Sequence, residues 1–193
     1  MGLPQHLPGF SRDAFFVWEA AQPTKHEYMA GEVFALVGAR QDHVVVSGAL
    51  FACFRQHLRG TRCRAYTSDM RLEVLAADAV FYPDAMVTCE EADLQHPLAV
   101  QAPCLVVKVL SDSTAAFDCG GKFSAYRQLA SLQDYLLVDI DRRRVELFRR
   151  HAEGWMLHEP AGAPPVLALT SIGLQLTDHD VFGDLGASAM PGA

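Results

Sequence analysis

The chain has 193 residues, of which 50% are hydrophobic and 20% are charged, and its formal net charge is −7. This composition is typical of a soluble globular protein and excludes a disordered chain. No apolar run approaches the roughly 20 residues of a membrane-spanning helix, and no basic leader precedes an apolar segment. We therefore expect a cytoplasmic protein without membrane contact. The acidic balance argues against a general nucleic-acid coat protein but permits a nuclease, since a metal-binding centre is itself acidic.

Capping and turn residues predict the elements of the first half. Ser11 and Asp42 are good helix N-caps, Gly60 is a credible C-cap, and Gly31 supplies a hairpin turn. Pro83 indicates that a strand starts at the next residue. The predicted elements are a helix over 11–22, strands at 25–29 and 32–37, a helix over 42–58, and strands at 62–67, 69–75 and 84–88.

The second half predicts a central strand flanked by further strands. Residues 105–110 are almost all β-branched or leucine, which is typical of a strand covered on both faces. We expect an α/β (α+β) fold, a mixed β-sheet flanked by helices, as one domain over 11–185 with irregular tails at 1–10 and 186–193. The remaining predicted elements are a loop over 90–103, a helix over 116–129, strands at 134–140, 144–149, 155–158 and 166–169, and a segment 174–182 that ends in a short helix.

The five cysteines are an odd number without a Cys-x-x-Cys spacing. This pattern indicates neither a disulfide framework nor a structural zinc site. Free cysteine in an apolar strand behaves as a small hydrophobe. We therefore expect no catalytic cysteine.

Asp84 and Lys108 are the first candidates for a site. Asp84 follows Pro83 beside the apolar core, where a carboxylate is costly unless it has a partner, a metal or access to a cleft. A solvated turn aspartate is the alternative. Lys108 interrupts an apolar strand, and its parity places it on the face of Val106 and Leu110. Because a buried ammonium requires a partner, we predict that Lys108 pairs with Asp84.

Further candidates lie on the first hairpin and on the predicted helix after position 108. Glu27 and Glu32 could reach a metal directly or through water, or could be exposed edge residues. Asp118 and Lys122 stand four residues apart. Lys122 could form a surface pair with Asp118, or it could stabilise the charge on a phosphate.

Three other polar features have structural explanations that we favour. His43 stands at the start of a predicted helix and suits a capping or surface role. The Asp-His-Asp cluster at 178–180 is contiguous, so its side chains cannot all converge on one ion, and a helix cap is preferred. The arginines at 142–144 and 149–150 are candidates for phosphate contacts, but a solvated hairpin is the preferred interpretation.

Several of these residues combine into a pattern that covers about 11–182. Its parts are Glu27 with Gly31-Glu32, His43, Tyr82-Pro83-Asp84, Pro103-x-Leu105-Val106-Val107-x-Val109-Leu110-Ser111, Asp118-x-x-x-Lys122-x-x-x-Tyr126 and Asp134-Tyr135-Leu136-Leu137-Val138-Asp139. With these motifs the chain resembles the Uma-two family, bacterial proteins described as restriction endonucleases with the PD-(D/E)XK nuclease-like fold. Only the combination of motifs is specific.

The resemblance implies a restriction-endonuclease-like fold and a hydrolase that cleaves DNA with Mg²⁺ or Mn²⁺. In the family pattern Asp84 is the first metal ligand, a glutamate stands at position 108, and Lys122 takes the lysine role. Lys108 replaces that glutamate here and removes one of two central ligands, so the metal could be lost. Glu32 or Glu27 could compensate as metal ligands.

Three hypotheses follow for the function. The first is an active Mg²⁺-dependent endonuclease with an altered centre that uses Asp84, Lys122 and Glu32. The second is a catalytically inactive nuclease fold that retains nucleic-acid binding, motivated by Lys108. The third is an interaction protein that forms a homodimer through an apolar strand or helix surface.

Overall fold

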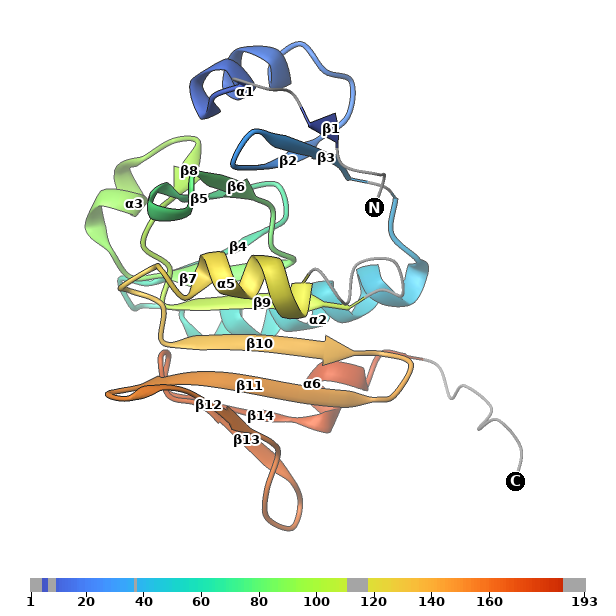
Figure 1. The fold of residues 1–193 in the computed structure, drawn as a ribbon. Coiled ribbons are helices and arrows are strands. Elements are labelled where there is room, and N and C mark those ends of the chain that lie inside the picture. The colour runs from blue at the N-terminus through green and yellow to red at the C-terminus, as the bar shows by residue number, and fades with distance from the viewer. Residues whose placement is uncertain (1–4, 7–9, 37, 111–117, 186–193) are drawn as a thin grey trace.

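The computed structural model describes residues 5–6, 10–36, 38–110 and 118–185, and most of its strands form two six-stranded mixed sheets (Figure 1). Sheet A has the order β1-β3-β2-β6-β5-β8 and consists of β1 (Gln5–His6), β2 (His26–Met29), β3 (Glu32–Ala35), β5 (Arg71–Val74), β6 (Ala79–Phe81) and β8 (Ala99–Val100). Sheet B has the order β12-β11-β10-β9-β7-β4 and consists of β4 (Arg64–Thr67), β7 (Ala85–Thr88), β9 (Leu105–Val109), β10 (Asp134–Asp139), β11 (Arg144–His151) and β12 (Gly154–His158).

The helices pack around these sheets, which confirms the predicted fold class, although the strands divide between two large sheets. Among the described residues, no helix combines the length and the hydrophobicity needed to cross a membrane. The other elements are α1 (Arg12–Glu19), α2 (Gln41–His57), the 3₁₀ turn η1 (Leu75–Ala77), α3 (Glu91–Gln95), the π-helical turn η2 (Asp118–Lys122) that runs into α5 (Phe123–Tyr126), the hairpin β13 (Val166–Leu169) and β14 (Leu174–Thr177), and α6 (Asp178–Phe182).

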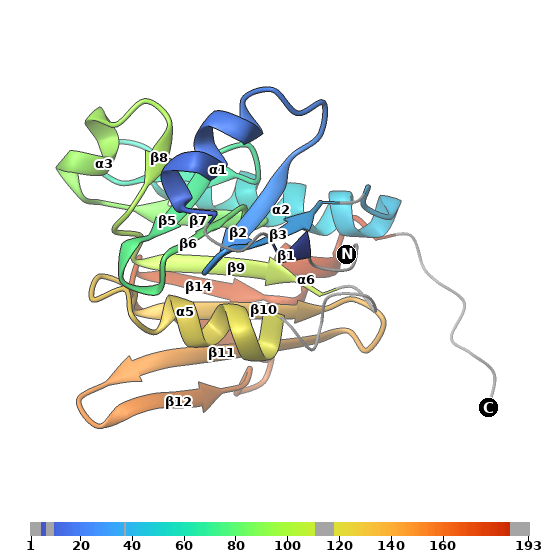
Figure 2. The ribbon, with the colours of Figure 1, turned by 45° about the horizontal axis from the view of Figure 1, so that its top comes forward.

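Alternation along β9 assigns the two faces of sheet B to two hydrophobic cores. Leu105, Val107 and Val109 pack with α2 and α6, whereas Val106 packs with α5 and with strands of sheet A. Figures 1 and 2 show α5 against sheet B on the side of sheet A. All residues of β9 are buried, so the predicted central strand is confirmed. Because side chains alternate, Lys108 shares the face of Val106, as predicted.

Local signals explain the N-terminal elements. Ser11 caps α1, since its hydroxyl accepts a hydrogen bond of 3.2 Å from the third helical N–H. The β2–β3 turn has positive φ at both central residues, 48° at Ala30 and 91° at Gly31. This conformation suits the twist of a tight hairpin, as predicted.

The ends of α2 differ from the prediction by a few residues. The helix begins at Gln41 with Arg40 at the N-cap position, so Asp42 lies in the first turn instead of capping it. Its charge there still favours the positive end of the helix dipole. Leu58 is the C-cap, and Gly60 adopts φ +78° just beyond it.

Segments whose structure depends on distant partners were predicted less well. The predicted loop 90–103 contains α3 and β8, because Val100 pairs in parallel with Leu72 of β5. The closing segment contains a strand as well as the expected helix, and the predicted irregular lead-in contains β1. The helix start at 116–117, the end of the lead-in at 7–9 and the tail at 186–193 lie outside the described residues.

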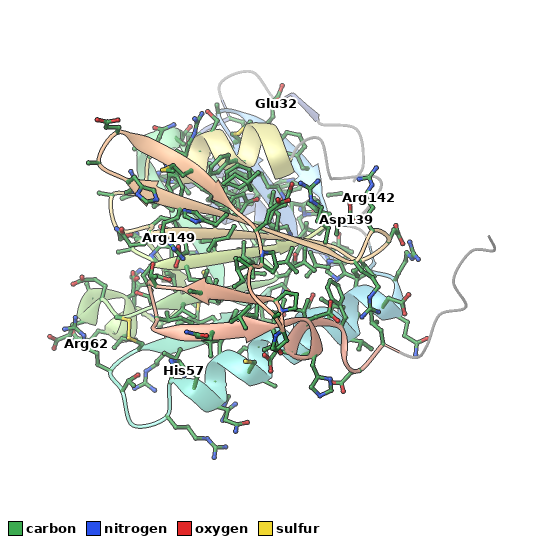
Figure 3. The ribbon with its side chains drawn as sticks, turned by 90° about the horizontal axis from the view of Figure 1, so that it is seen from below. Glu32, His57, Arg62, Asp139, Arg142 and Arg149 are labelled. Atoms are coloured by element: carbon green, nitrogen blue, oxygen red, sulfur yellow. A yellow bond between two sulfur atoms is a disulfide. The ribbon has the colours of Figure 1, made fainter. Side chains whose placement is uncertain are left out.

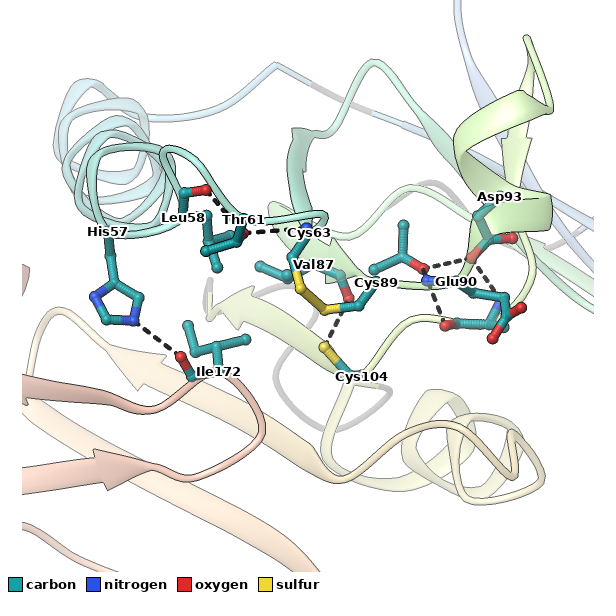
Figure 4. The surroundings of a disulfide bond; sticks show 12 residues. His57, Leu58, Thr61, Cys63, Val87, Cys89, Glu90, Asp93, Cys104 and Ile172 are labelled. Atoms are coloured by element: carbon teal, nitrogen blue, oxygen red, sulfur yellow. Dashed lines mark hydrogen bonds between the residues drawn. A yellow bond between two sulfur atoms is a disulfide. The ribbon is translucent and has the colours of Figure 1, made fainter.

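The structure contains a disulfide that the cysteine spacing did not predict. Cys63 and Cys89 are bonded, with Cα atoms 4.0 Å apart (Figure 4). They precede β4 and follow β7, and the register that pairs Arg64 with Thr88 brings them together. Spacing rules miss such a bond because it arises from pairing between strands that are distant in sequence.

Candidate functional site

Asp84 and Lys108 lie side by side at the ends of two neighbouring strands. β7 and β9 run antiparallel with Ala85 opposite Val107, and the next position of this register brings Asp84 to Lys108. Lys108 Nζ lies 3.0 Å from Asp84 Oδ2, which confirms the predicted pair. The backbone N–H of Val109 donates a hydrogen bond of 2.7 Å to the same oxygen. The two residues are only 7% and 8% exposed, so the pair is almost fully removed from water.

Lys122 forms a second buried pair, with Glu27 of β2. Lys122 Nζ lies 2.7 Å from Glu27 Oε2, and both residues are 1% exposed. The ammonium also lies 5.8 Å from the centroid of the Phe81 ring, where the π-system attracts a cation. The predicted partner, Asp118, belongs to η2, but its side chain lies outside what the structure describes. Sheet A, packed over α5, brings Glu27 to the lysine.

The segment Tyr82–Asp84 joins the two ion pairs. The backbone N–H of Tyr82 donates a hydrogen bond of 3.1 Å to Glu27 Oε1, while Asp84 two residues later holds Lys108. Burial, followed by the charge of Glu19, raises the pKa of the Tyr82 phenol, so this side chain is neutral at physiological pH. Asp84, Lys108, Lys122 and Glu27 therefore form two ion pairs linked through this segment, and we call these residues together the four-residue centre.

His43 also reaches this centre. It lies in the first turn of α2, with Nε2 3.4 Å from Asp84 Oδ1. The hydroxyl of Ser47 donates a hydrogen bond of 2.7 Å to the His43 carbonyl oxygen. A surface or capping role was favoured from the sequence, and that interpretation missed this contact. The signal that could have revealed it is the helical register, which directs the side chain of His43 toward the core side of α2.

Glu32 lies on the same face of the β2–β3 hairpin as Glu27. The register pairs Met29 with Glu32 and Glu27 with Phe34, so Glu32 is two positions nearer the turn. Two strand positions correspond to about 7 Å. Glu32 is the first residue of β3, directly after the turn, and is labelled in Figure 3.

The two carboxylates of the four-residue centre are each engaged by a lysine. Mg²⁺ and Mn²⁺ bind mainly through carboxylate and other oxygens, but Asp84 and Glu27 each contact a lysine ammonium. In the described part of the chain, no three His, Cys, Asp or Glu side chains converge into a metal-binding group. Two carboxylates and two ammonium groups give the centre a formal charge of zero. A glutamate at position 108 would make this charge −2, which suits a divalent cation.

The arginines of the β10–β11 hairpin contact acidic side chains and backbone carbonyl oxygens. Arg142 contacts Asp139 at 2.9 Å (both labelled in Figure 3) and Arg143 contacts Asp178 at 3.1 Å, and both arginine side chains are substantially exposed. Arg149 Nε donates a hydrogen bond to the buried carboxylate of Asp134. Asp180 forms a capping box with Thr177, so the cap preferred for cluster 178–180 is confirmed. These contacts favour structural roles for the basic residues.

An apolar cavity lies on the opposite face of sheet B from the four-residue centre. Its volume is about 350 Å³. The cavity lies between β11, α6 and the β13–β14 hairpin. A molecule bound in it would not contact the four-residue centre. The lining residues are Arg143, Val145, Pro160, Pro165, Leu167, Leu176, Thr177, Asp178, Val181 and Phe182.

The arrangement of strands and helices is that of a nuclease fold. A crystal structure of "a putative nuclease belonging to DUF820" from Anabaena variabilis matches with a TM-score of 0.72 over 89% of this chain and 96% of that chain. The identity is 16%, so this likeness concerns the fold.

The sequence comparisons define the family. The family model Uma2, "Putative restriction endonuclease", matches residues 12–178, and the chain belongs to this family. An uncharacterized Synechocystis protein, slr1290, is 38% identical over 93% of this chain and 94% of its own length. A second one, sll1609, is 35% identical over 72% of this chain and 80% of its own length. The resemblance found in the motifs is thereby confirmed.

Proposed function

We propose that this chain is a nuclease-family protein in which Lys108 has taken the place of the catalytic cation, so that metal-dependent cleavage is lost while the fold is kept. The observation that carries the proposal is the 3.0 Å contact between Lys108 Nζ and Asp84 Oδ2. The family pattern has a glutamate at this position. Here the side chain brings a positive charge to a carboxylate that would otherwise be a metal ligand.

The electrostatic argument is simple. A magnesium ion lies about 2.0–2.1 Å from each ligand oxygen, so an ion on Asp84 would lie within a few ångströms of the Lys108 ammonium. At a separation of about 4 Å and an effective dielectric constant of about 20, a divalent ion and an ammonium repel by on the order of 8 kcal/mol. Metal binding would therefore require Lys108 to leave its buried position.

The finer expectations about partners stay predictions. We propose DNA as the nucleic acid that the fold contacts, a homodimer as the assembly and the cytoplasm as the location. Because Arg142 and Arg143 each engage an acid, we expect weak, salt-sensitive DNA affinity. Fluorescence anisotropy with labelled duplex DNA at two salt concentrations measures this affinity, and light scattering measures the assembly.

The proposal is tested with Lys108→Glu. Calorimetric titration with Mn²⁺ and nicking of plasmid DNA compare the natural chain with this variant, and Lys25→Glu serves as a control that makes the same charge change at an exposed pair. We expect Mn²⁺ binding and nicking to appear only in Lys108→Glu and to be lost again when Asp84→Asn is added. Mn²⁺-dependent nicking by the natural chain that Asp84→Asn abolishes would overturn the proposal and favour the active endonuclease.

A further inference from the structure

We propose that Cys63 and Cys89 form a thiol–disulfide exchange site that takes small dithiols as reductants. The disulfide lies beside β4, the edge strand of sheet B, and both cysteines are partly exposed (Figure 4). A reductant can therefore approach without unfolding the chain. This proposal does not depend on the state of the four-residue centre.

The other described thiols, Cys53 and Cys104, are poorly placed to attack the disulfide as nucleophiles. Burial raises the pKa of the Cys104 thiol to about 11, and this thiol donates a hydrogen bond to the carbonyl oxygen of Val87, with Sγ 3.4 Å from that oxygen. Burial also raises the pKa of Cys53. Because the thiolate is the reactive form, burial makes both side chains less reactive near neutral pH than an exposed thiol. Exchange is thus confined to the disulfide.

The charges beside the two sulfurs differ and set the direction of attack. Cys63 stands between Arg62 and Arg64, whereas Cys89 is followed by Glu90 and Glu91, and all four charged residues are exposed. Figure 3 shows Arg62 close to the disulfide. Positive neighbours stabilise a departing thiolate and negative neighbours destabilise it. Cys63 is therefore the leaving group, and the sulfur of Cys89 is attacked.

The exchange proceeds in two balanced steps. A thiolate of the dithiol bonds to Cys89 Sγ, the Sγ–Sγ bond breaks, and its electron pair stays on Cys63, which takes a proton. The second sulfur of the reductant then attacks the reductant sulfur that is bonded to Cys89. The mixed disulfide breaks, and Cys89 leaves and takes a proton. The protein gains two electrons and two protons, and the dithiol becomes a cyclic disulfide.

Hydrogen bonds through two threonine hydroxyls order the chain beside the two cysteines, and they do not involve the sulfur atoms. The Cys63 N–H donates to Thr61 Oγ1 at 3.1 Å, and the Thr61 hydroxyl donates to the Leu58 carbonyl oxygen at 2.8 Å. On the other strand the Glu90 N–H donates to Thr88 Oγ1 at 3.1 Å. The dithiol is thus held ready to close again. Since disulfides that form in reducing compartments are usually redox-active, this arrangement suits the expected cytoplasmic location.

The test uses the folded natural chain with and without dithiothreitol at pH 7.5. After alkylation and peptide mapping, we expect a linked Cys63–Cys89 peptide before reduction, alkylation of both cysteines afterwards, and no labelling of Cys53 or Cys104 until the chain is unfolded. Reduction should also lower the melting temperature by roughly 5–10 °C in the natural chain and leave Cys63→Ser/Cys89→Ser unchanged. Absence of the linked peptide from air-exposed protein, or its persistence in excess dithiothreitol, would overturn the proposal.

The direction of attack has its own measurement. Cys89→Ser leaves Cys63 as the free thiol, and Cys63→Ser leaves Cys89. We expect iodoacetamide to alkylate Cys63 several-fold faster than Cys89 at pH 7. Equal rates, or a faster Cys89, would overturn the assignment of Cys63 as the leaving group.

Discussion

Lys108 Nζ lies 3.0 Å from Asp84 Oδ2, although α3 and β8 separate the two residues in the chain. The contact joins the start of β7 to β9, and the Val109 N–H completes it on the same carboxylate oxygen. A charged pair at this depth costs much desolvation energy. Removing one partner leaves the other charge buried, so the pair has a measurable effect on stability.

We expect Lys108→Met to lower the free energy of unfolding by about 3–5 kcal/mol, because the Asp84 carboxylate then stays buried without its ammonium. Adding Asp84→Asn should recover part of this loss. The control is Lys25→Met at the Lys25–Asp69 pair, whose side chains are 44% and 88% exposed, and the expected change there is at most about 1 kcal/mol. Urea unfolding measures the stability of all three variants. If Lys108→Met loses as little stability as the control, the buried pair does not stabilise the fold.

Glu27→Gln tests the second pair. The glutamine can still accept the Tyr82 N–H, but the Lys122 ammonium loses a carboxylate at 2.7 Å in a place that is almost fully buried. We expect a loss of about 3–5 kcal/mol in unfolding free energy, partly reversed in Glu27→Gln/Lys122→Met. Chemical denaturation gives the coupling energy. Additive effects of the two single changes would show that the pair does not act as a unit.

Arg150 is expected to be structural. Its guanidinium donates hydrogen bonds to three carbonyl oxygens after α5, at 2.7 Å to Leu132, 2.7 Å to Leu129 and 3.0 Å to Arg127. Each bond contributes about 0.5–1.5 kcal/mol, so Arg150→Met should lower the unfolding free energy by about 2–4 kcal/mol. Arg142→Met, at a side chain 79% exposed, should change it by less than about 1 kcal/mol. Thermal and urea unfolding measure both variants, and an equal loss of stability in Arg150→Met and Arg142→Met would contradict this assignment.

Stability should fall at alkaline pH through Cys104. Burial raises the pKa of this thiol from 9.0 to about 11, so the folded state holds the proton more tightly than the unfolded state does. The contribution is complete below pH 9 and is lost between pH 9 and 11, at up to about 1.4 kcal/mol per pH unit. Other groups titrate in this range, so the measurement is the difference between the natural chain and Cys104→Ala. Parallel pH profiles would contradict the prediction.

Local sequence patterns were enough to predict much of the fold. The β-branched run at 105–110 predicted the central strand, and its two-residue period placed Lys108 on the face of Val106. Both predictions held because strand formation and side-chain alternation depend on neighbouring residues. The Asp84–Lys108 pair was also predictable, since a buried ammonium needs a carboxylate and Asp84 opens the adjacent strand.

Other contacts depend on how distant segments pack. Helical spacing suggested Asp118, whose side chain lies outside what the structure describes, as a partner of Lys122, and it gave no sign of Glu27, which the packing of sheet A over α5 supplies. His43 meets Asp84 through the position of α2, and Cys63 meets Cys89 through the register of β4 against β7.

The sequence by itself determined the family, the main strands and the identity of the residue at position 108. The tertiary structure decided which charges meet: Lys108 contacts Asp84, Lys122 contacts Glu27, and the formal charge of these four residues is zero. The physical reason is that propensity and periodicity act over a few residues, whereas ion pairs and strand register are set by segments that lie far apart in the chain.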